Sequence, residues 1–133
     1  MPRKRSPKAR QPRPTDSECM ILNVIWEQGP STVREVFDEL NTTQEMGYTT
    51  VLKFMQIMTE KGILARDTTV RPQLYRAAES KQKTQKTLLN DLLDRAFSGS
   101  PGTLALQALA IRKSTPEELR EIRTLLDKLE EGG

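Results

Sequence analysis

Apolar residues recur at helical spacing along most of the chain after its first fourteen residues. Three stretches, at about 16–28, 33–40 and 47–61, each place apolar side chains on one helical face and polar side chains on the other. A glycine-proline pair ends the first stretch, and Gly62 ends the third. The apolar positions expected to face a common core are Cys19, Leu22, Ile25, Trp26, Val33, Val36, Phe37, Leu40, Val51, Phe54, Met55 and Met58.

A threonine followed three residues later by a glutamate marks the start of three predicted helices. The pairs are Thr15 with Glu18, Thr32 with Glu35, and Thr115 with Glu118. In such a capping box, the threonine hydroxyl accepts a hydrogen bond from the glutamate N–H, and the carboxylate accepts one from the threonine N–H. Each pair therefore predicts that a helix begins at the residue after the threonine.

After the third helix, the pattern changes to two short extended runs at 63–69 and 73–78, separated by a break that contains Pro72. Three helices followed by a β-hairpin are the order of a winged helix-turn-helix, whose third helix enters the DNA major groove. We therefore predict a mainly α fold with a small β-hairpin. A winged helix domain occupies 15–78, and a helical dimerisation domain occupies 79–133.

Three leucine-rich helices are predicted in the second half, at about 81–97, 103–111 and 116–130. Helices this short in about 50 residues cannot bury their apolar faces by themselves. A second copy of the chain is the simplest partner to cover them. The candidate dimerisation residues are Leu89, Leu92, Leu93, Leu104, Leu109, Leu119, Ile122, Leu126 and Leu129.

The outer face of the third helix and the hairpin carry the candidate DNA contacts. These residues are Tyr48, Thr49, Thr50, Leu52, Lys53 and Gln56 on the helix, Arg66, Arg71 and Arg76 in the hairpin, and Thr32 at the start of the second helix. Threonine and lysine can bind base edges, and an exposed leucine can contact a thymine methyl group. The hairpin arginines would bind phosphates. The alternatives are ordinary first-turn threonines and a solvated face of arginines.

Composition argues against an enzyme. The 133 residues include no histidine and one cysteine, Cys19, so histidine acid/base catalysis, Cys/His metal sites and disulfides are excluded. Glu117, Glu118 and Glu121 are spaced like a helix start, with no nucleophile or base around them. We expect no catalytic residue, no metal and no cofactor, and we assign Cys19 and Trp26 to packing.

Positive charge is concentrated in residues 1–14, which carry six basic residues, no acidic residue and four of the eight prolines. Residues 15–78 have a net charge of −3, and 79–133 are neutral. We expect a disordered tail that either solubilises the chain or adds DNA phosphate contacts. No stretch approaches the roughly 20 apolar residues of a membrane span, and no apolar signal segment follows the basic start. A cytoplasmic protein without membrane contact is expected.

The sequence resembles the BlaI/MecI/CopY family of bacterial repressors, also called penicillinase repressors. The runs that carry the resemblance are 22–36 with its Trp-Glu-x-Gly and Thr-Val-Arg-Glu-Val motifs, 47–52 with Tyr-Thr-Thr-Val, 60–64, and 71–76. The resemblance implies a homodimeric winged-helix repressor that binds inverted-repeat operators through its third helix and wing. It also implies that Thr49, Thr50 and Leu52 face DNA, whereas Lys53 replaces a residue that is commonly small and polar.

Two departures from the family concern how the repressor is released. Antibiotic-responsive members are cleaved at an Asn-Phe step after a membrane sensor metalloprotease is activated, but the corresponding residues 105–108 are Ala-Leu-Gln-Ala. The bond between Gln107 and Ala108 is the candidate cleavage site here. Copper-responsive members carry C-terminal Cys-x-Cys pairs, and this chain has no cysteine after Cys19.

The leading interpretation is a repressor that acts as a homodimer on an inverted-repeat operator of double-stranded DNA and is relieved by proteolysis of its C-terminal domain. Two alternatives remain open at this point. One is a nonspecific or architectural DNA-binding protein that uses the basic tail as its main contact. The other is a protein-interaction adaptor in which the winged domain binds a protein partner through the third helix.

Overall fold

The computed structural model describes residues 13–43 and 45–132, and the predicted basic tail at 1–14 falls outside them except for its last two residues. The chain divides into two compact units between Leu89 and Asn90. The first unit holds the predicted winged helix, and the second holds the last helices of the chain.

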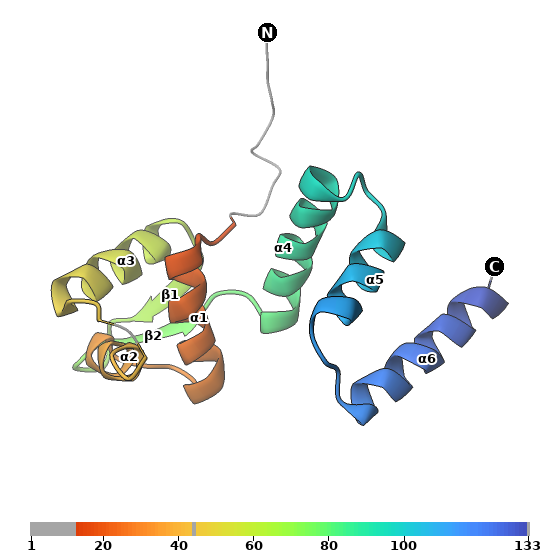
Figure 1. Cartoon of the computed structure of the whole chain (residues 1–133). Helices are drawn as coiled ribbons and strands as arrows, with labels where there is room; N and C mark the ends of the chain where they lie inside the picture. Colours follow the sequence, from red (N-terminus) through yellow and green to blue (C-terminus); the bar gives the residue numbers. More distant parts are fainter. Residues whose placement is uncertain (1–12, 44, 133) are drawn as a thin grey trace, which may run out of the picture. The chain divides into compact units, whose positions relative to one another are not determined.

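The order of helices and strands is the one that the sequence predicts (Figure 1). In chain order the elements are α1 (Asp16–Gln28), α2 (Val33–Leu40), α3 (Tyr48–Glu60), β1 (Leu64–Asp67), β2 (Leu74–Ala77), α4 (Lys81–Ala96), α5 (Pro101–Ile111) and α6 (Pro116–Glu131). Each helix begins and ends within two residues of its predicted bounds. The predicted fold class, a mainly α winged helix-turn-helix with a small β-hairpin, is confirmed.

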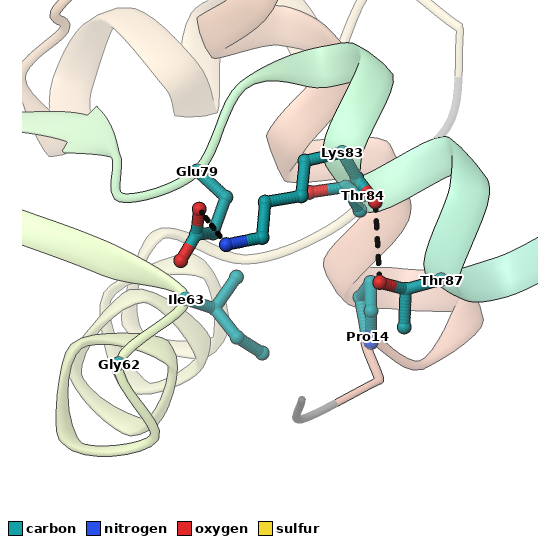
Figure 2. A pocket seen from close by; sticks show the side chains of 7 residues that line it. All are labelled: Pro14, Gly62, Ile63, Glu79, Lys83, Thr84 and Thr87. Atoms are coloured by element: carbon teal, nitrogen blue, oxygen red, sulfur yellow. Dashed lines mark hydrogen bonds and ion pairs between the residues drawn. The ribbon is translucent and has the colours of Figure 1, made fainter. Parts of the chain in front are cut away.

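The division between the units lies inside α4, whereas the sequence predicted a domain boundary before this helix. The first turns of α4 line a small cavity together with Pro14 and Ile63 of the first unit (Figure 2). In this part of α4, Lys83 forms an ion pair with Glu79 at 3.2 Å, and the Thr87 hydroxyl donates to the Lys83 carbonyl. The beginning of α4 therefore belongs to the winged helix unit.

The three predicted capping boxes are all formed. At the start of α2, the Glu35 N–H donates to the Thr32 hydroxyl at 3.1 Å, and the Thr32 N–H donates to the Glu35 carboxylate at 2.8 Å. Gly29 and Gly62 follow α1 and α3 with φ angles of 88° and 81°. A side chain would strain the backbone in this left-handed region, so glycine ends both helices at a fixed place.

Replacing Thr32 with alanine should lower the free energy of unfolding by about 1 kcal/mol, because the Glu35 N–H loses its acceptor. Replacing Thr32 with serine keeps the hydroxyl and is the matched control. Urea denaturation of both variants measures the effect. An alanine variant as stable as the wild type would show that the cap contributes nothing.

The core of the first unit lies between α1, α2, α3 and the hairpin. Its buried apolar residues are Ile21, Leu22, Val24, Ile25, Val33, Val36, Leu40, Val51, Met55, Met58, Ile63, Leu64 and Tyr75. The sequence also predicts Cys19, Trp26, Phe37 and Phe54 in this core, but these four residues are only half-buried. Trp26, Phe37 and Phe54 pack against the edge of the core. The burial of α1 extends to Ile21 and Val24 because α2, α3 and β2 all pack against this helix.

The hairpin is attached to the helices through its second strand. Strands β1 and β2 pair antiparallel, and β2 also forms a bridge with Ser31 just before α2. The Tyr75 N–H donates to the Ser31 carbonyl at 2.8 Å, and the Ser31 N–H donates to the Tyr75 carbonyl at 2.9 Å. Leu64 and Tyr75 contribute to the core, so the hairpin has a fixed position relative to α3.

Candidate nucleic-acid interface

Helix α3 is held by its inner face and is open on its outer face. Val51, Met55 and Met58 are each completely buried in the core. The predicted reader residues on the other side of the helix are all exposed; they are Thr49, Thr50, Lys53 and Gln56. Because these side chains lie on one face of a rigidly packed helix, the structure brings together most of the predicted helix contacts.

The start of α3 has no side-chain cap, since Gly47 occupies the capping position. The first N–H groups of α3 therefore have no side-chain acceptor at the position that a serine or threonine fills in the capped helices. Tyr48, the first residue of α3, is 41% exposed and contacts Phe37 of α2 edge to face at 5.5 Å between ring centroids. The guanidinium of Arg34 lies 5.5 Å from the centre of the Phe37 ring. This aromatic contact ties α2 to the N-terminal turn of α3.

Two of the predicted DNA contacts have other roles in the structure. Leu52, which the sequence predicts to be exposed, is half-buried and packs against the core. Burial of its apolar side chain is favourable, and it places Leu52 at the edge of the outer face. Thr32 uses its hydroxyl to accept the hydrogen bond that caps α2. That oxygen therefore already has a partner within the protein.

The three predicted hairpin arginines are exposed, but they do not share a face. Arg66 is in β1 opposite Tyr75, and Arg76 is in β2 opposite Ala65. Arg71 lies in the turn between the strands. Since residues directly opposite in an antiparallel pair lie on the same face and neighbours alternate, Arg66 and Arg76 are on opposite faces of the hairpin.

A partly buried ion pair that sequence reasoning missed joins the start of α1 to the end of α3. The Lys61 ammonium donates to both carboxylate oxygens of Glu18 at 3.0 and 2.9 Å. The Glu18 side chain is only 3% exposed, and it also accepts from the Thr15 N–H at 3.0 Å. Glu18 therefore caps α1 and fixes the C-terminal end of α3 with the same carboxylate.

The Cys19 thiol has a raised pKa, caused first by burial and then by the charges of Asp16 and Glu18. We expect Cys19 to react with a disulfide reagent at pH 8 more slowly than free cysteine, because less of the thiolate is present. Since the thiol ionises more readily in the unfolded chain, this group should also favour unfolding as the pH rises through its pKa range. Reaction as fast as that of free cysteine would contradict the assignment of Cys19 to packing.

The described residues contain no group of three His, Cys, Asp or Glu side chains that could hold a metal ion. In the same part of the chain, no helix is long and apolar enough to cross a bilayer.

The penicillinase repressor family model matches residues 14–128, which is most of the chain. The chain belongs to the penicillinase repressor family. Members of this family are DNA-binding transcriptional repressors. The resemblance noted in the sequence is therefore confirmed, and the family places the chain among transcriptional regulators.

Individual relatives of this penicillinase repressor family member are distant. The transcriptional regulator BlaI of Mycobacterium tuberculosis strain ATCC 25618 / H37Rv is 26% identical over 118 residues, which cover 88% of this chain and 85% of the relative. The penicillinase repressor of Bacillus licheniformis is 22% identical over 117 residues, covering 88% and 91%. A solved MarR family protein from Bacillus stearothermophilus shares the fold, with a TM-score of 0.51, 18% identity, and coverage of 89% of this chain and 74% of that one.

The candidate cleavage residues of this family member lie within α5. Gln107 and Ala108 are both exposed, and both are in the helical conformation. A protease binds its substrate in an extended conformation, so cleavage at this bond requires local unfolding of α5.

Proposed function

We propose that this chain is a sequence-specific repressor that acts as a homodimer on an inverted-repeat DNA operator. The observation that carries the proposal is the outer face of α3, where Thr49, Thr50, Lys53 and Gln56 are exposed on a helix whose inner face is fixed in the core. These side chains offer hydroxyl, ammonium and amide groups, which are the groups that read base edges in a major groove.

The apolar surface of the second unit supports a homodimer. None of its described residues is buried, and α5 and α6 expose many large apolar side chains. Leu92, Leu109, Leu119, Leu126 and Leu129 of the predicted dimerisation set are exposed, as is Leu89 at the end of the first unit. Three other residues of the predicted set are half-buried: Leu93, Leu104 and Ile122. Exposed apolar area outside the predicted set comes from Leu106, Ile111 and Leu125. Exposed apolar side chains in this number are typical of an interaction site, and a second copy can cover them.

The mechanism is occlusion of a promoter. A twofold axis would place the two α3 helices in major grooves about 34 Å apart or at a multiple of that distance, which matches a pseudo-palindromic operator. Repression would end when the C-terminal unit is cut between Gln107 and Ala108 after a membrane sensor metalloprotease is activated. Incubation with such a protease that leaves residues 103–112 intact would contradict this route of release.

The charge of the winged helix favours a second candidate, a nonspecific DNA-binding protein. Residues 15–78 have a net charge of −3, whereas residues 1–14 carry six basic residues and no acidic residue. A protein that binds mainly through such a tail would have affinity for DNA without preference for a sequence.

Selection of duplexes from a randomised pool separates these candidates. The full chain is incubated with the pool at about physiological salt, and the bound duplexes are recovered and sequenced over several rounds. We expect enrichment of an inverted repeat whose halves are centred about 10 base pairs or a multiple apart. Tight binding without an enriched motif would support the nonspecific protein, and absence of binding would support the adaptor.

A further inference from the structure

We propose that Arg66 is the strand arginine through which the wing binds a DNA phosphate, and that Arg76 makes no such contact. The inference rests on the proposed function, because it takes α3 as the helix that docks on DNA. It separates Arg66 from Arg76, two of the three hairpin arginines that the sequence treats as equivalent.

The register of the hairpin separates the two strand arginines. Arg66 lies opposite Tyr75, and Arg76 lies opposite Ala65. Opposite residues share a face, and successive residues of a strand alternate between faces. One face therefore carries Arg66 with Leu64 and Tyr75, and the other carries Arg76 with Ala65.

The face of Arg66 is the one turned toward α3. Leu64 and Tyr75 are buried in the same core as Met55 and Met58 of α3. Arg66 is two residues after Leu64 in β1, on the same face of the hairpin, and it is exposed. A duplex that lies along α3 is thus approached by the wing from the face of Arg66.

An acidic group lies on the face of Arg76. Asp67 pairs with Leu74 in the register and shares this face. The N–H and hydroxyl of Thr69 donate to Asp67 at 2.9 and 2.6 Å. These hydrogen bonds first, and then the charge of Arg76, lower the pKa of the Asp67 carboxyl below its ordinary value. A carboxyl with even the ordinary pKa is ionised at neutral pH.

The charge of Asp67 offsets that of Arg76 and repels a phosphate from the same face. The strand residues that share the face of Arg66 are Leu64, Tyr75 and Ala77, and none of them is acidic. The face turned toward α3 is therefore positive, whereas the outer face is neutral. Both the position and the charge of the hairpin favour Arg66.

Arg66→Gln and Arg76→Gln form a matched pair for the test, because each removes one positive charge from an exposed strand position. The dissociation constant for one duplex is measured at several salt concentrations for the wild type and both variants. Arg66→Gln should reduce the slope of log affinity against log salt by about one, while Arg76→Gln leaves it unchanged. Equal slopes in all three proteins, or a reduced slope in Arg76→Gln, would overturn the inference.

Asp67→Asn is an independent third variant, because it removes the repelling charge and keeps both arginines. Because the face of Asp67 lies away from the duplex, this variant should leave the salt slope unchanged, whereas a slope larger by about one would show that Arg76 has gained a phosphate contact and would overturn the inference. Circular dichroism confirms that each variant is folded. If the wild type binds no duplex, both the proposed function and the inference are overturned. If the wild type binds but the salt slope falls in Arg76→Gln and not in Arg66→Gln, only the inference is overturned.

Discussion

Lys61→Met should lower the free energy of unfolding by about 1–3 kcal/mol, because it leaves the buried carboxylate of Glu18 without its partly exposed cation. The Glu18 side chain is 3% exposed, whereas the Lys61 side chain is 36% exposed. Methionine keeps most of the length and apolar area of the lysine side chain. The loss therefore reports on the charge rather than on packing, and urea denaturation measures it.

A double variant isolates the ion pair. Glu18→Gln removes the charge and keeps an oxygen that can accept from the Thr15 N–H. Glu18→Gln combined with Lys61→Met should recover much of the stability that Lys61→Met loses, because no uncompensated charge remains. A double variant whose losses simply add would show that the two side chains do not interact.

Lys53→Ala should weaken binding to the selected operator by about 1–3 kcal/mol, which is roughly 5-fold to 150-fold. The side chain is exposed on the outer face of α3. In the proposed complex it would reach a guanine or a phosphate. Lys86→Ala is the matched control, since Lys86 is an exposed lysine of α4 outside the proposed interface. Fluorescence anisotropy titrations of both variants measure the effect.

The base preference of the variant distinguishes the two contacts open to Lys53. If it binds a base, Lys53→Ala relaxes the preference at one position of each half-site when the duplex selection is repeated. If it binds phosphate, the affinity falls for all sequences and the salt slope decreases by about one. An affinity loss no greater than that of Lys86→Ala would remove Lys53 from the interface.

The features that depend on residues close in sequence could be predicted. The capping boxes at Thr15, Thr32 and Thr115 fixed three helix starts, because the threonine and its glutamate are three residues apart. The outer face of α3 followed from helical spacing alone. Gly29 and Gly62 gave the ends of α1 and α3 for the same local reason.

The features that depend on distant residues could not be predicted. Glu18 already had a complete local role as a capping residue, and its partner Lys61 is 43 residues away. The partial burial of Leu52 depends on how α3 packs on its neighbours, which its position on a helix does not decide. The opposite faces of Arg66 and Arg76 required the register of β1 with β2.

The central claim is that this family member reads a DNA sequence, and the ratio of two dissociation constants tests it most directly. The full chain is titrated with the selected duplex and with a duplex of the same composition in shuffled order, at the same near-physiological salt. We predict that the selected duplex binds at least about 10³-fold more tightly. A ratio close to one would contradict sequence-specific repression.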